Sequence, residues 1–524
     1  MCGFLFTEGE VSEKLFLDSF ALIQHRGPDQ SKVMKAPWGV FGFHRLSIMD
    51  ISEHGMQPFD TEELRLVCNG EIYNEHVFRL MFANYPFISS SDCEVLLPLY
   101  FASKDKMAGM LDAEFAFVLY DKLSGEVMAA RDPIGIRPLF YGKLKDTGKM
   151  AFASEAKALH MLCVEVMPFP PGHVYYQGMF TDYAKITQVT STLNDLEDID
   201  SKIRNGLSAA VTKRLMSDVP IGYLLSGGLD SSLVCALAQR MTPIPIDTFA
   251  IGMVKDAIDL KYARQVAAFI GSNHHEVTMT IKDVLQALKH VVYHLESYDI
   301  TTIRASMGMY LLCRYIKENT NIKVLMTGEI SDELFGYKYT DFAPSGEEFQ
   351  KESEKRIKEL YMYDVLRADR CIAAWSLEAR VPFGDLNFVR DVMAIRPELK
   401  MNTNGQGKYL LRKAFQHEGL LPSEILWREK AAFSDAVGHS MVEELKKYAK
   451  SIYTKEDVKQ AQMRFPHCPP HTHEALLYRE IFENMYARRA EMISGFWMPN
   501  PSWQGCQVDD PSARVLSNYG DSGK

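Results

Sequence analysis

The chain has 524 residues, of which 47% are hydrophobic and 24% are charged, and its formal net charge is −10 at pH 7. This length predicts two large domains, and the composition is that of a folded protein, which excludes disorder over most of the chain. The negative charge and the lack of a Lys/Arg-rich run exclude a protein that binds the phosphate backbone of nucleic acids.

The first half of the chain is predicted to form a layered α+β domain. From Cys2 to about Gln188, short β-like runs alternate with turns rich in Gly, Pro and Asp. The runs are Trp38–Phe43, Arg65–Cys68, Phe115–Tyr120 and Val127–Ala130.

The sequence begins with Met1-Cys2-Gly3. Removal of Met1 would leave Cys2 with a thiol nucleophile and a free α-amine on one residue. Because an α-amine has a pKa of about 7.7 to 8.0, part of it is unprotonated at neutral pH and can accept the thiol proton. These three residues alone do not distinguish such a nucleophile from an ordinary small residue after the initiator.

A change of composition marks the boundary between the two halves. The chain turns polar and acidic between Thr187 and Asp200, with no apolar repeat long enough to pack. Beyond it, apolar residues recur every four positions and predict an amphipathic helix. They are Ile199, Ile203, Leu207, Val211 and Leu215.

A strand, a glycine-rich turn and a helix then follow one another. Pro220–Leu225 is the predicted strand, Ser226-Gly227-Gly228 the turn, and Ser231–Arg240 the helix. Glycines let a ligand approach the backbone, while amides, hydroxyls and the helix dipole attract an anion, so this unit predicts a phosphate-binding loop. It lacks the Lys of G-x-x-x-x-G-K-[ST], which argues against γ-phosphoryl transfer. Asp230 could hold a magnesium ion against phosphate oxygens.

The remaining elements predict a parallel α/β sheet with a helical C-terminal part. Candidate strands Asp247–Ile251 and Lys323–Met326 alternate with helical stretches near Asp259–Ile270 and Ala305–Glu318, and helical patterns dominate from Glu348 to Met485. The last residues are rich in Pro, Ser, Gly and Asp, which predicts a mobile tail. The expected parts are a first domain (1–190), a linker (191–200), a second domain (201–495) and the tail (496–524).

Motifs in both halves resemble a single enzyme family. Ser226–Ser232 is similar to the PP-loop of ATP pyrophosphatases, which cleave ATP between the α and β phosphates. The N-terminal motifs are Met1-Cys2-Gly3, His25–Asp29, Arg45–Asp50, Gln57-Pro58, Asn69–Asn74 and Ser91–Glu94. The C-terminal motifs are Ser217–Ser232, Phe249–Gly252, Thr327–Glu333, Glu378–Phe383 and Trp427–Asp435. Over nearly everything before the tail, the chain resembles the glutamine-dependent asparagine synthetases of the B type.

The resemblance implies the fold of both domains. The first would be a class II glutamine amidotransferase domain, an Ntn-hydrolase αββα sandwich of the α+β class. The second would be an α/β parallel-sheet PP-loop domain, similar to adenine nucleotide α-hydrolases, with a helical C-terminal part.

The resemblance also implies a glutamine site. Cys2 would attack the amide carbon of glutamine, and the oxyanion would be held by the side-chain amide of Asn69 and the backbone N–H of Gly70. Arg45 would pair with the α-carboxylate of glutamine, and Asp92 would accept from its α-ammonium. The other implied glutamine-binding residues are Leu46, Ser47, Ile48, Met49 and Glu71.

A second implied site would bind ATP. Glu329 matches the family residue that takes part in forming the acyl-adenylate and receives ammonia, and Lys430 the lysine that neutralises charge on the phosphates. Asp230 and Asp332 are the implied magnesium ligands. The implied ATP-binding set is Leu224, Ser226, Gly227, Gly228, Leu229, Asp230, Ser231, Ser232, Ile251, Thr327 and Gly328.

By this resemblance we expect an ATP-dependent carbon–nitrogen ligase with ATP as co-substrate and Mg²⁺ as cofactor. Glutamine would give glutamate and ammonia, aspartate and ATP would give β-aspartyl-AMP and pyrophosphate, and ammonia would displace AMP to give asparagine. Because free ammonia would escape or be protonated, an internal passage should join the two sites.

The expected partners are the small molecules glutamine, aspartate and ATP, and neither nucleic acid nor a membrane is expected to bind. No apolar run reaches the roughly 18 residues that span a bilayer. The nine cysteines are scattered and form no C-x-x-C pair, which fits a reducing, cytoplasmic location and indicates no structural zinc site. The oligomeric state, a homodimer included, stays open.

The chain also departs from the family pattern. Ile330 stands where the family has a glycine, so a β-branched residue replaces one that tolerates any backbone angle. Leu334–Asp341 is shorter than the matching stretch, with Asp341 where aromatic or basic residues are usual, and Ala431 and Ala436 replace a polar residue and a glycine near Lys430.

These departures leave two alternatives open. The same architecture could act on another carboxylate, as in relatives that close a β-lactam, although those lack a working N-terminal cysteine. The chain could also be a synthetase-impaired regulatory or binding homologue. Retention of the implied catalytic and metal residues argues against that second alternative; they are Cys2, Asp230, Glu329, Asp332 and Lys430.

Overall fold

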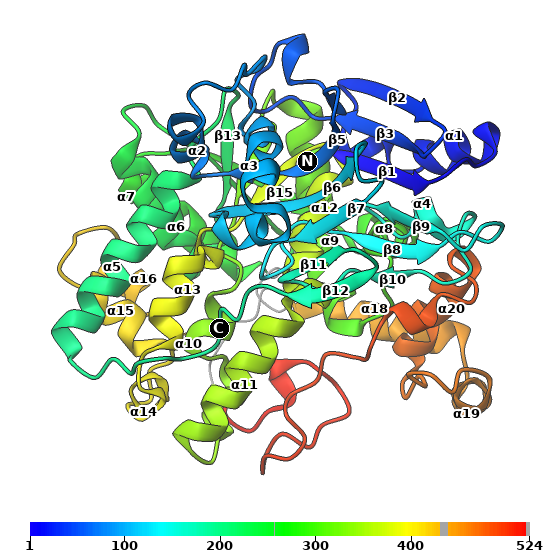
Figure 1. The fold of residues 1–524 in the computed structure, drawn as a ribbon. Helices are drawn as coiled ribbons and strands as arrows, with labels where there is room; N and C mark the ends of the chain where they lie inside the picture. Colours follow the sequence, from blue (N-terminus) through cyan, green and yellow to red (C-terminus); the bar gives the residue numbers. More distant parts are fainter. Residues whose placement is uncertain (256, 430–438, 520–524) are drawn as a thin grey trace.

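The computed structural model describes residues 1–255, 257–429 and 439–519. Its N-terminal part, blue to cyan in Figure 1, contains two antiparallel six-stranded sheets. The first has the order β10-β8-β9-β1-β3-β2, with β1 (Gly3–Glu8), β2 (Gln30–Ala36), β3 (Gly39–Arg45), β8 (Phe140–Lys143), β9 (Met150–Ala153) and β10 (Met167–Pro168). The second has the order β12-β11-β7-β6-β5-β4, with β4 (Phe59–Asp60), β5 (Leu64–Ile72), β6 (Ala113–Asp121), β7 (Val127–Arg131), β11 (His173–Tyr176) and β12 (Met179–Asp182).

The two sheets pack face to face and are covered by helices on their outer faces. One core cluster joins the inner faces, including Phe4, Phe6, Phe41, Phe43, Val67, Val118 and Ala129. Helices α1 (Glu13–Ala21) and α4 (Lys157–His160) cover the first sheet, and α3 (Leu96–Ser103) covers the second; α2 (Glu75–Met81) follows β5. The predicted αββα sandwich is therefore confirmed, and its central strands are buried on both faces, as β6 is along its whole length.

The second domain is built on a five-stranded parallel sheet, as predicted. Its order is β15-β14-β13-β16-β17. The strands are β13 (Ile221–Leu224), β14 (Asp247–Met253), β15 (Asn273–Met279), β16 (Val324–Met326) and β17 (Glu378–Arg380). The connections after β13 run to one side of the sheet and those after β16 to the other, which leaves a crevice at the carboxyl ends of these two strands.

Helices surround this sheet and form the C-terminal part. They are α5 (Leu196–Lys213), α6 (Leu229–Met241), α7 (Ile258–Ile270), α8 (Ile281–Leu295), α9 (Ile300–Asn319), α10 (Ser331–Phe335), α11 (Gly346–Glu359), α12 (Asp364–Ala373), α13 (Leu386–Met393), α14 (Pro397–Lys400), α15 (Tyr409–Phe415), α16 (Ser423–Leu426), α18 (His439–Ile452), α19 (Lys455–Arg464) and α20 (His473–Met485). No helix in the described part of the chain has the length and hydropathy needed to span a bilayer.

Helix α5 follows the predicted apolar repeat. Ile199, Ile203, Leu207 and Val211 are buried, whereas Leu215 lies past the helix end at Lys213. Its N-cap is Asp195, whose carboxylate accepts from the backbone N–H groups of residues 197 and 198. The helix thus begins at Leu196, inside the segment 191–200 that the sequence assigned to a linker.

Helices dominate residues 348–485 as predicted, and the structure adds a strand there and differs from the expected tail. The helical region predicted for residues 348–485 also contains a strand, β17, which is buried. Its Arg380 forms ion pairs with Glu378 on the same strand and with Glu71, which is distant in the sequence. The predicted tail is packed as far as Tyr519, because Trp497, Trp503, Cys506 and Leu516 join a hydrophobic cluster with α11. Arg356 of α11 donates to the carbonyl oxygen of Met498 at 2.6 Å, and this segment, red in Figure 1, lies beside α11.

The interface between the domains is unusually rich in buried charge. Arg26 of the first domain pairs with Asp369 of the second at 2.9 Å, and Arg370 pairs with Glu155 and Glu296, both at 2.9 Å. All five side chains are almost fully buried. Because a buried charge without its partner is costly, these pairs fix how the two domains sit against each other.

Candidate active sites

The thiol of Cys2 lies where the first domain meets the second. Its backbone N–H donates to Asn69 Oδ1 at 3.0 Å, and its Sγ lies 3.7 Å from the carbonyl oxygen of Leu46. Burial raises the pKa of the Cys2 thiol to about 11, so the thiol is protonated at neutral pH and needs a base before it can attack. Met1 precedes it in the structure, and burial lowers the pKa of the Met1 α-amine to about 6. The α-amine of Met1 is therefore largely neutral at pH 7.

Asn69 and Gly70 lie beside the thiol on β5. Because Asn69 Oδ1 accepts from Cys2, its Nδ2 points the other way, and this buried donor has no hydrogen-bond partner among the described residues. Such a donor is costly unless a ligand oxygen satisfies it. Gly70 is required by packing, since a Cβ there would lie 2.6 Å from the carbonyl oxygen of Glu114 on β6. The structure thus brings together the predicted nucleophile and the predicted oxyanion donors.

Arg45 and Asp92, predicted to bind the glutamine backbone, are both buried. Arg45 donates to the carbonyl oxygen of Ser52 at 2.6 Å, to Gln30 Oε1 at 3.1 Å and to the carbonyl oxygen of Asp50. Asp92 accepts from the N–H of Ile72 at 2.7 Å. Burial raises the pKa of Asp92 to about 6, so it is still charged at neutral pH and can accept from an ammonium group.

The other predicted glutamine residues line the domain boundary. Leu46 and Ile48 pack against Val324 of the second domain, with Met49 at the edge of the same cluster. The N–H of Ser47 donates to Asp29 at 2.8 Å. Glu71 is 3% exposed and pairs with Arg380 of the second domain, its Oε1 lying 3.3 Å from Nη2.

A separate cavity opens at the carboxyl ends of β13 and β16. Most of the predicted ATP-binding residues line it; they are Leu224, Ser226, Gly228, Leu229, Asp230, Ser231, Ile251, Thr327 and Gly328. Gly227 instead packs against α7, since its φ is +73° and a Cβ there would lie 2.4 Å from the nitrogen of Ala263, and Ser232 is buried within the fold. The turn leads into α6, so the positive end of a 13-residue helix faces this cavity.

The two predicted magnesium ligands converge on one lysine. Lys408 Nζ lies 2.8 Å from both carboxylate oxygens of Asp230 and 2.6 Å from Asp332 Oδ1. Ser331 donates to the same Asp230 carboxylate at 2.8 Å. Lys408 has a φ of +56° and follows the turn Gly405-Gln406-Gly407. Carboxylate oxygens are ligands that Mg²⁺ prefers, so Asp230 and Asp332 are chemically suited to hold this ion.

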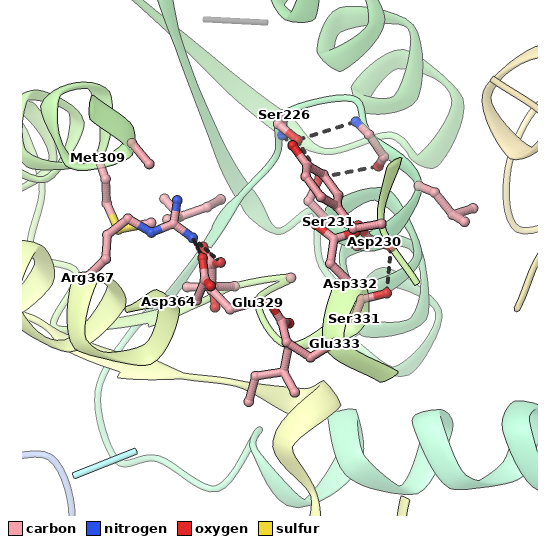
Figure 2. A pocket seen from close by; sticks show the side chains of 18 of the residues that line it. Ser226, Asp230, Ser231, Met309, Glu329, Ser331, Asp332, Glu333, Asp364 and Arg367 are labelled. Atoms are coloured by element: carbon pink, nitrogen blue, oxygen red, sulfur yellow. Dashed lines mark hydrogen bonds and ion pairs between the residues drawn. The ribbon is translucent and has the colours of Figure 1, made fainter. Parts of the chain in front are cut away.

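Glu329 lies across the cavity from these carboxylates. Figure 2 shows Arg367 directed at Glu329 and Asp364 on one side, with Asp230 and Ser231 on the other. Arg367 lies 3.0 Å from Asp364 and makes a shorter contact with Glu329. The cavity therefore has charged groups at both ends.

Ile330 follows Glu329 with a φ of +81°, the left-handed region that its family position fills with glycine. Its side chain is 2% exposed and points away into the core, close to Gly384 and Ile136. Ile330 therefore has the backbone conformation that glycine adopts most readily.

The C-terminal segment forms one wall of the same cavity. Trp497, Pro511 and Ser512 line it, and Asp510 pairs with Arg304 of α9 at 2.8 Å. Arg304 also pairs with Glu474. Residues that composition alone suggested to be a tail therefore complete a site.

The sequence analysis missed several residues that line the cavity. One residue that it predicted to be catalytic lies outside the described residues. Lys408, Arg367 and Arg304 matched no quoted motif, and only the glycine turn before Lys408 hinted at a special backbone. Lys430, predicted to be catalytic, lies outside the described residues, as do Ala431 and Ala436.

Comparison with known proteins relates both domains to characterised families. The family model "Asparagine synthase" matches residues 202–346 and 341–508, and "Glutamine amidotransferase domain" matches residues 1–190. The glutamine-hydrolysing asparagine synthetase of Cricetulus griseus is 41% identical over 96% of this chain and 96% of its own. Probable glutamine-hydrolysing asparagine synthetases of Dictyostelium discoideum and Schizosaccharomyces pombe are 40% and 42% identical, over 98% and 95% of this chain and 98% and 94% of theirs.

Two solved structures show a distant similarity. A glutamine phosphoribosylpyrophosphate amidotransferase from B. subtilis has 15% identity and a TM-score of 0.31, over 53% of this chain and 81% of its own. An NMN synthetase from Francisella tularensis has 14% identity and a TM-score of 0.25, over 59% and 100%.

Proposed function

Since the chain belongs to the asparagine synthase family, we propose that it makes asparagine from aspartate, with glutamine as nitrogen donor and MgATP as energy source. The observation that carries the proposal is the buried Asn69 amide beside Cys2, whose Nδ2 has no partner among the described residues. A donor held next to a nucleophile is what an acyl-transfer site needs for its oxyanion.

In the first domain, glutamine would be hydrolysed in two steps. With Met1 removed, the α-amine of Cys2 takes the thiol proton, and the sulfur attacks the amide carbon of glutamine. Asn69 Nδ2 and the N–H of Gly70 then stabilise the oxyanion, and its collapse releases ammonia, which carries away the transferred proton. Water cleaves the resulting thioester to give glutamate and regenerate the thiol.

In the second domain, ATP would lie across the carboxyl ends of β13 and β16. Ser226, Gly228 and the N-terminus of α6 are placed to receive phosphate oxygens. A β-carboxylate oxygen of aspartate attacks the α-phosphorus, so that a P–O bond forms and pyrophosphate leaves. Asp230 and Asp332 would hold Mg²⁺, which would neutralise phosphate charge when bound; both carboxylates line the nucleotide cavity, which supports that role.

Ammonia would then attack the acyl-adenylate near Glu329, with loss of AMP. The glutamine site borders the domain interface, which supports a passage from it into the second domain. The proposed setting is the cytoplasm, and the nine cysteines, all within the described residues, are free in agreement with a reducing compartment. A homodimer is compatible with this proposal and not required by it.

The test is to supply the purified chain with glutamine, aspartate and MgATP and to measure asparagine, glutamate, AMP and pyrophosphate. Equal amounts of asparagine and AMP are expected. A Cys2→Ala variant should lose glutamine-dependent synthesis and keep synthesis from ammonium salts. Formation of glutamate alone would leave a glutaminase, another acyl product would show a different carboxylate substrate, and ADP with phosphate would contradict the chemistry.

A further inference from the structure

The glutamine site of the first domain touches a charged side chain of the second. Asn69 and Glu71 lie two positions apart on β5, so both side chains point to the same face of the strand. Asn69 reaches Cys2, whereas the carboxylate of Glu71 faces Arg380, whose Nη2 lies 3.3 Å from Oε1. The other oxygen, Oε2, is buried without a hydrogen-bond partner among the described residues.

Arg380 is held rigidly in its place on β17. It is fully buried, and its Nε donates to Glu378 Oε1 at 3.0 Å. Its Nη1 donates to the carbonyl oxygen of Arg214 at 2.9 Å and also to that of Met216. These contacts occupy Nε and Nη1, and Nη2 forms an ion pair with Glu71 without making a hydrogen bond among the described residues.

The same residue also hydrogen-bonds to a residue that lines the nucleotide cavity. Arg380 is paired with Met326 across the parallel strands β16 and β17, and its carbonyl oxygen accepts from the N–H of Thr327 at 3.0 Å. Thr327 lines the cavity. One residue therefore contacts the segment that carries the oxyanion donors through its side chain and the nucleotide site through its backbone.

We propose that Arg380 of the second domain is a positioning residue for glutamine hydrolysis in the first: it holds Glu71 and thereby fixes the part of β5 that carries the oxyanion donors. This inference rests on the proposed function, because it assigns Arg380 a part in that reaction.

Charge explains why this contact positions the strand. A carboxylate as buried as Glu71 is costly unless a cation faces it. Burial and the charges of Glu378 and Asp92 raise the pKa of Glu71 well above its ordinary value, and the charges of Arg380 and Arg137 oppose that rise. Without Arg380, the Glu71 side chain would lose its nearest cation and move toward water, and Asn69 on the same strand face would move with it. An oxyanion donor displaced by a fraction of an ångström loses much of its effect.

The test measures kcat and KM for glutamine hydrolysis by the full chain in four forms: wild type, Arg380→Met, Glu71→Gln and the double variant. We expect kcat for Arg380→Met to fall by about tenfold or more, with KM changed less, because the donors act in the transition state. The kcat of the double variant should be no lower than that of the less active single variant, since the two residues act through one contact. Arg380→Lys keeps the charge and should recover part of kcat.

Arg489→Met is the matched control. Arg489 also crosses the domain interface, donating to the carbonyl oxygens of Val164 at 2.6 Å and Cys163 at 2.8 Å, but it contacts neither Glu71 nor Cys2. Its kcat for glutamine hydrolysis should stay near the wild-type value. An equal loss in this variant would mean general damage to the interface and would overturn the inference.

The remaining outcomes are also decisive. Wild-type kcat in a folded Arg380→Met variant, or multiplicative losses in the double variant, would overturn the role of Arg380 while leaving the proposed function intact. A wild-type chain that does not hydrolyse glutamine would instead overturn the proposed function. If Arg380→Met does not fold, Arg380→Lys takes its place. The kcat losses of Arg380→Lys, of Glu71→Gln and of their double variant are then compared in the same way.

Discussion

Replacing Ile330 by glycine separates backbone strain from packing beside Glu329. A β-branched residue at a φ of +81° costs about 1–3 kcal/mol, which glycine would recover. The side chain is 2% exposed and packs near Gly384 and Ile136, and deletion of such a buried side chain costs about 2–5 kcal/mol. Packing therefore outweighs strain, and we expect Ile330→Gly to be less stable than the wild type by about 2 kcal/mol.

Thermal unfolding of the full chain, followed by circular dichroism, measures this balance. A loss of that size should lower the melting temperature by about 4–8 °C. Ile330→Ala keeps the left-handed strain and also loses the packing, so it should be less stable than Ile330→Gly by about 1 kcal/mol. A glycine variant more stable than the wild type would refute the estimate of packing, and an alanine variant as stable as glycine would refute the strain.

Three further predictions concern the two sites. Asp92 has a pKa raised to about 6, so it is charged above that pH and neutral below; KM for glutamine should rise as pH falls from 7 to 5, and a constant KM would contradict its role. Lys408→Met removes the cation shared by Asp230 and Asp332 and should raise KM for MgATP at least about tenfold in pyrophosphate exchange, with glutamine hydrolysis unchanged. Asp510→Ala breaks the pair with Arg304, and proteolysis of the C-terminal segment should become at least about tenfold faster, whereas an unchanged rate would show that the pair does not anchor it.

Local sequence pattern was sufficient to predict the elements whose formation depends mainly on neighbouring residues. The four-residue apolar repeat from Ile199 to Val211 predicted α5, because burial of one helix face follows directly from that spacing. The strand, glycine turn and helix around residues 220–240 were predicted for a similar reason, since turn chemistry and helix start are written in adjacent residues. The position of Gly227 at a φ of +73° agrees with that turn.

Local sequence pattern did not predict β17 or the packing of the C-terminal segment, because both depend on long-range contacts. Glu378-Ala379-Arg380 has neither the length nor the apolar alternation of a predictable strand, and it exists because β16 and buried ion pairs hold it. Trp497–Tyr519 has a composition typical of a tail, yet α11 and Arg304 provide surfaces on which its few aromatic and acidic residues pack.

By itself, the sequence determined the class of each domain and the residues most directly tied to chemistry, such as Cys2 and Asp230, because their motifs are short and their roles local. Only the tertiary structure decided which groups face them. Lys408 meets Asp230 from 178 positions away, and Arg380 meets Glu71 across the domain interface. Such pairs depend on how the sheets and helices pack, and no spacing along the chain encodes a contact that forms only when two separate cores are brought together.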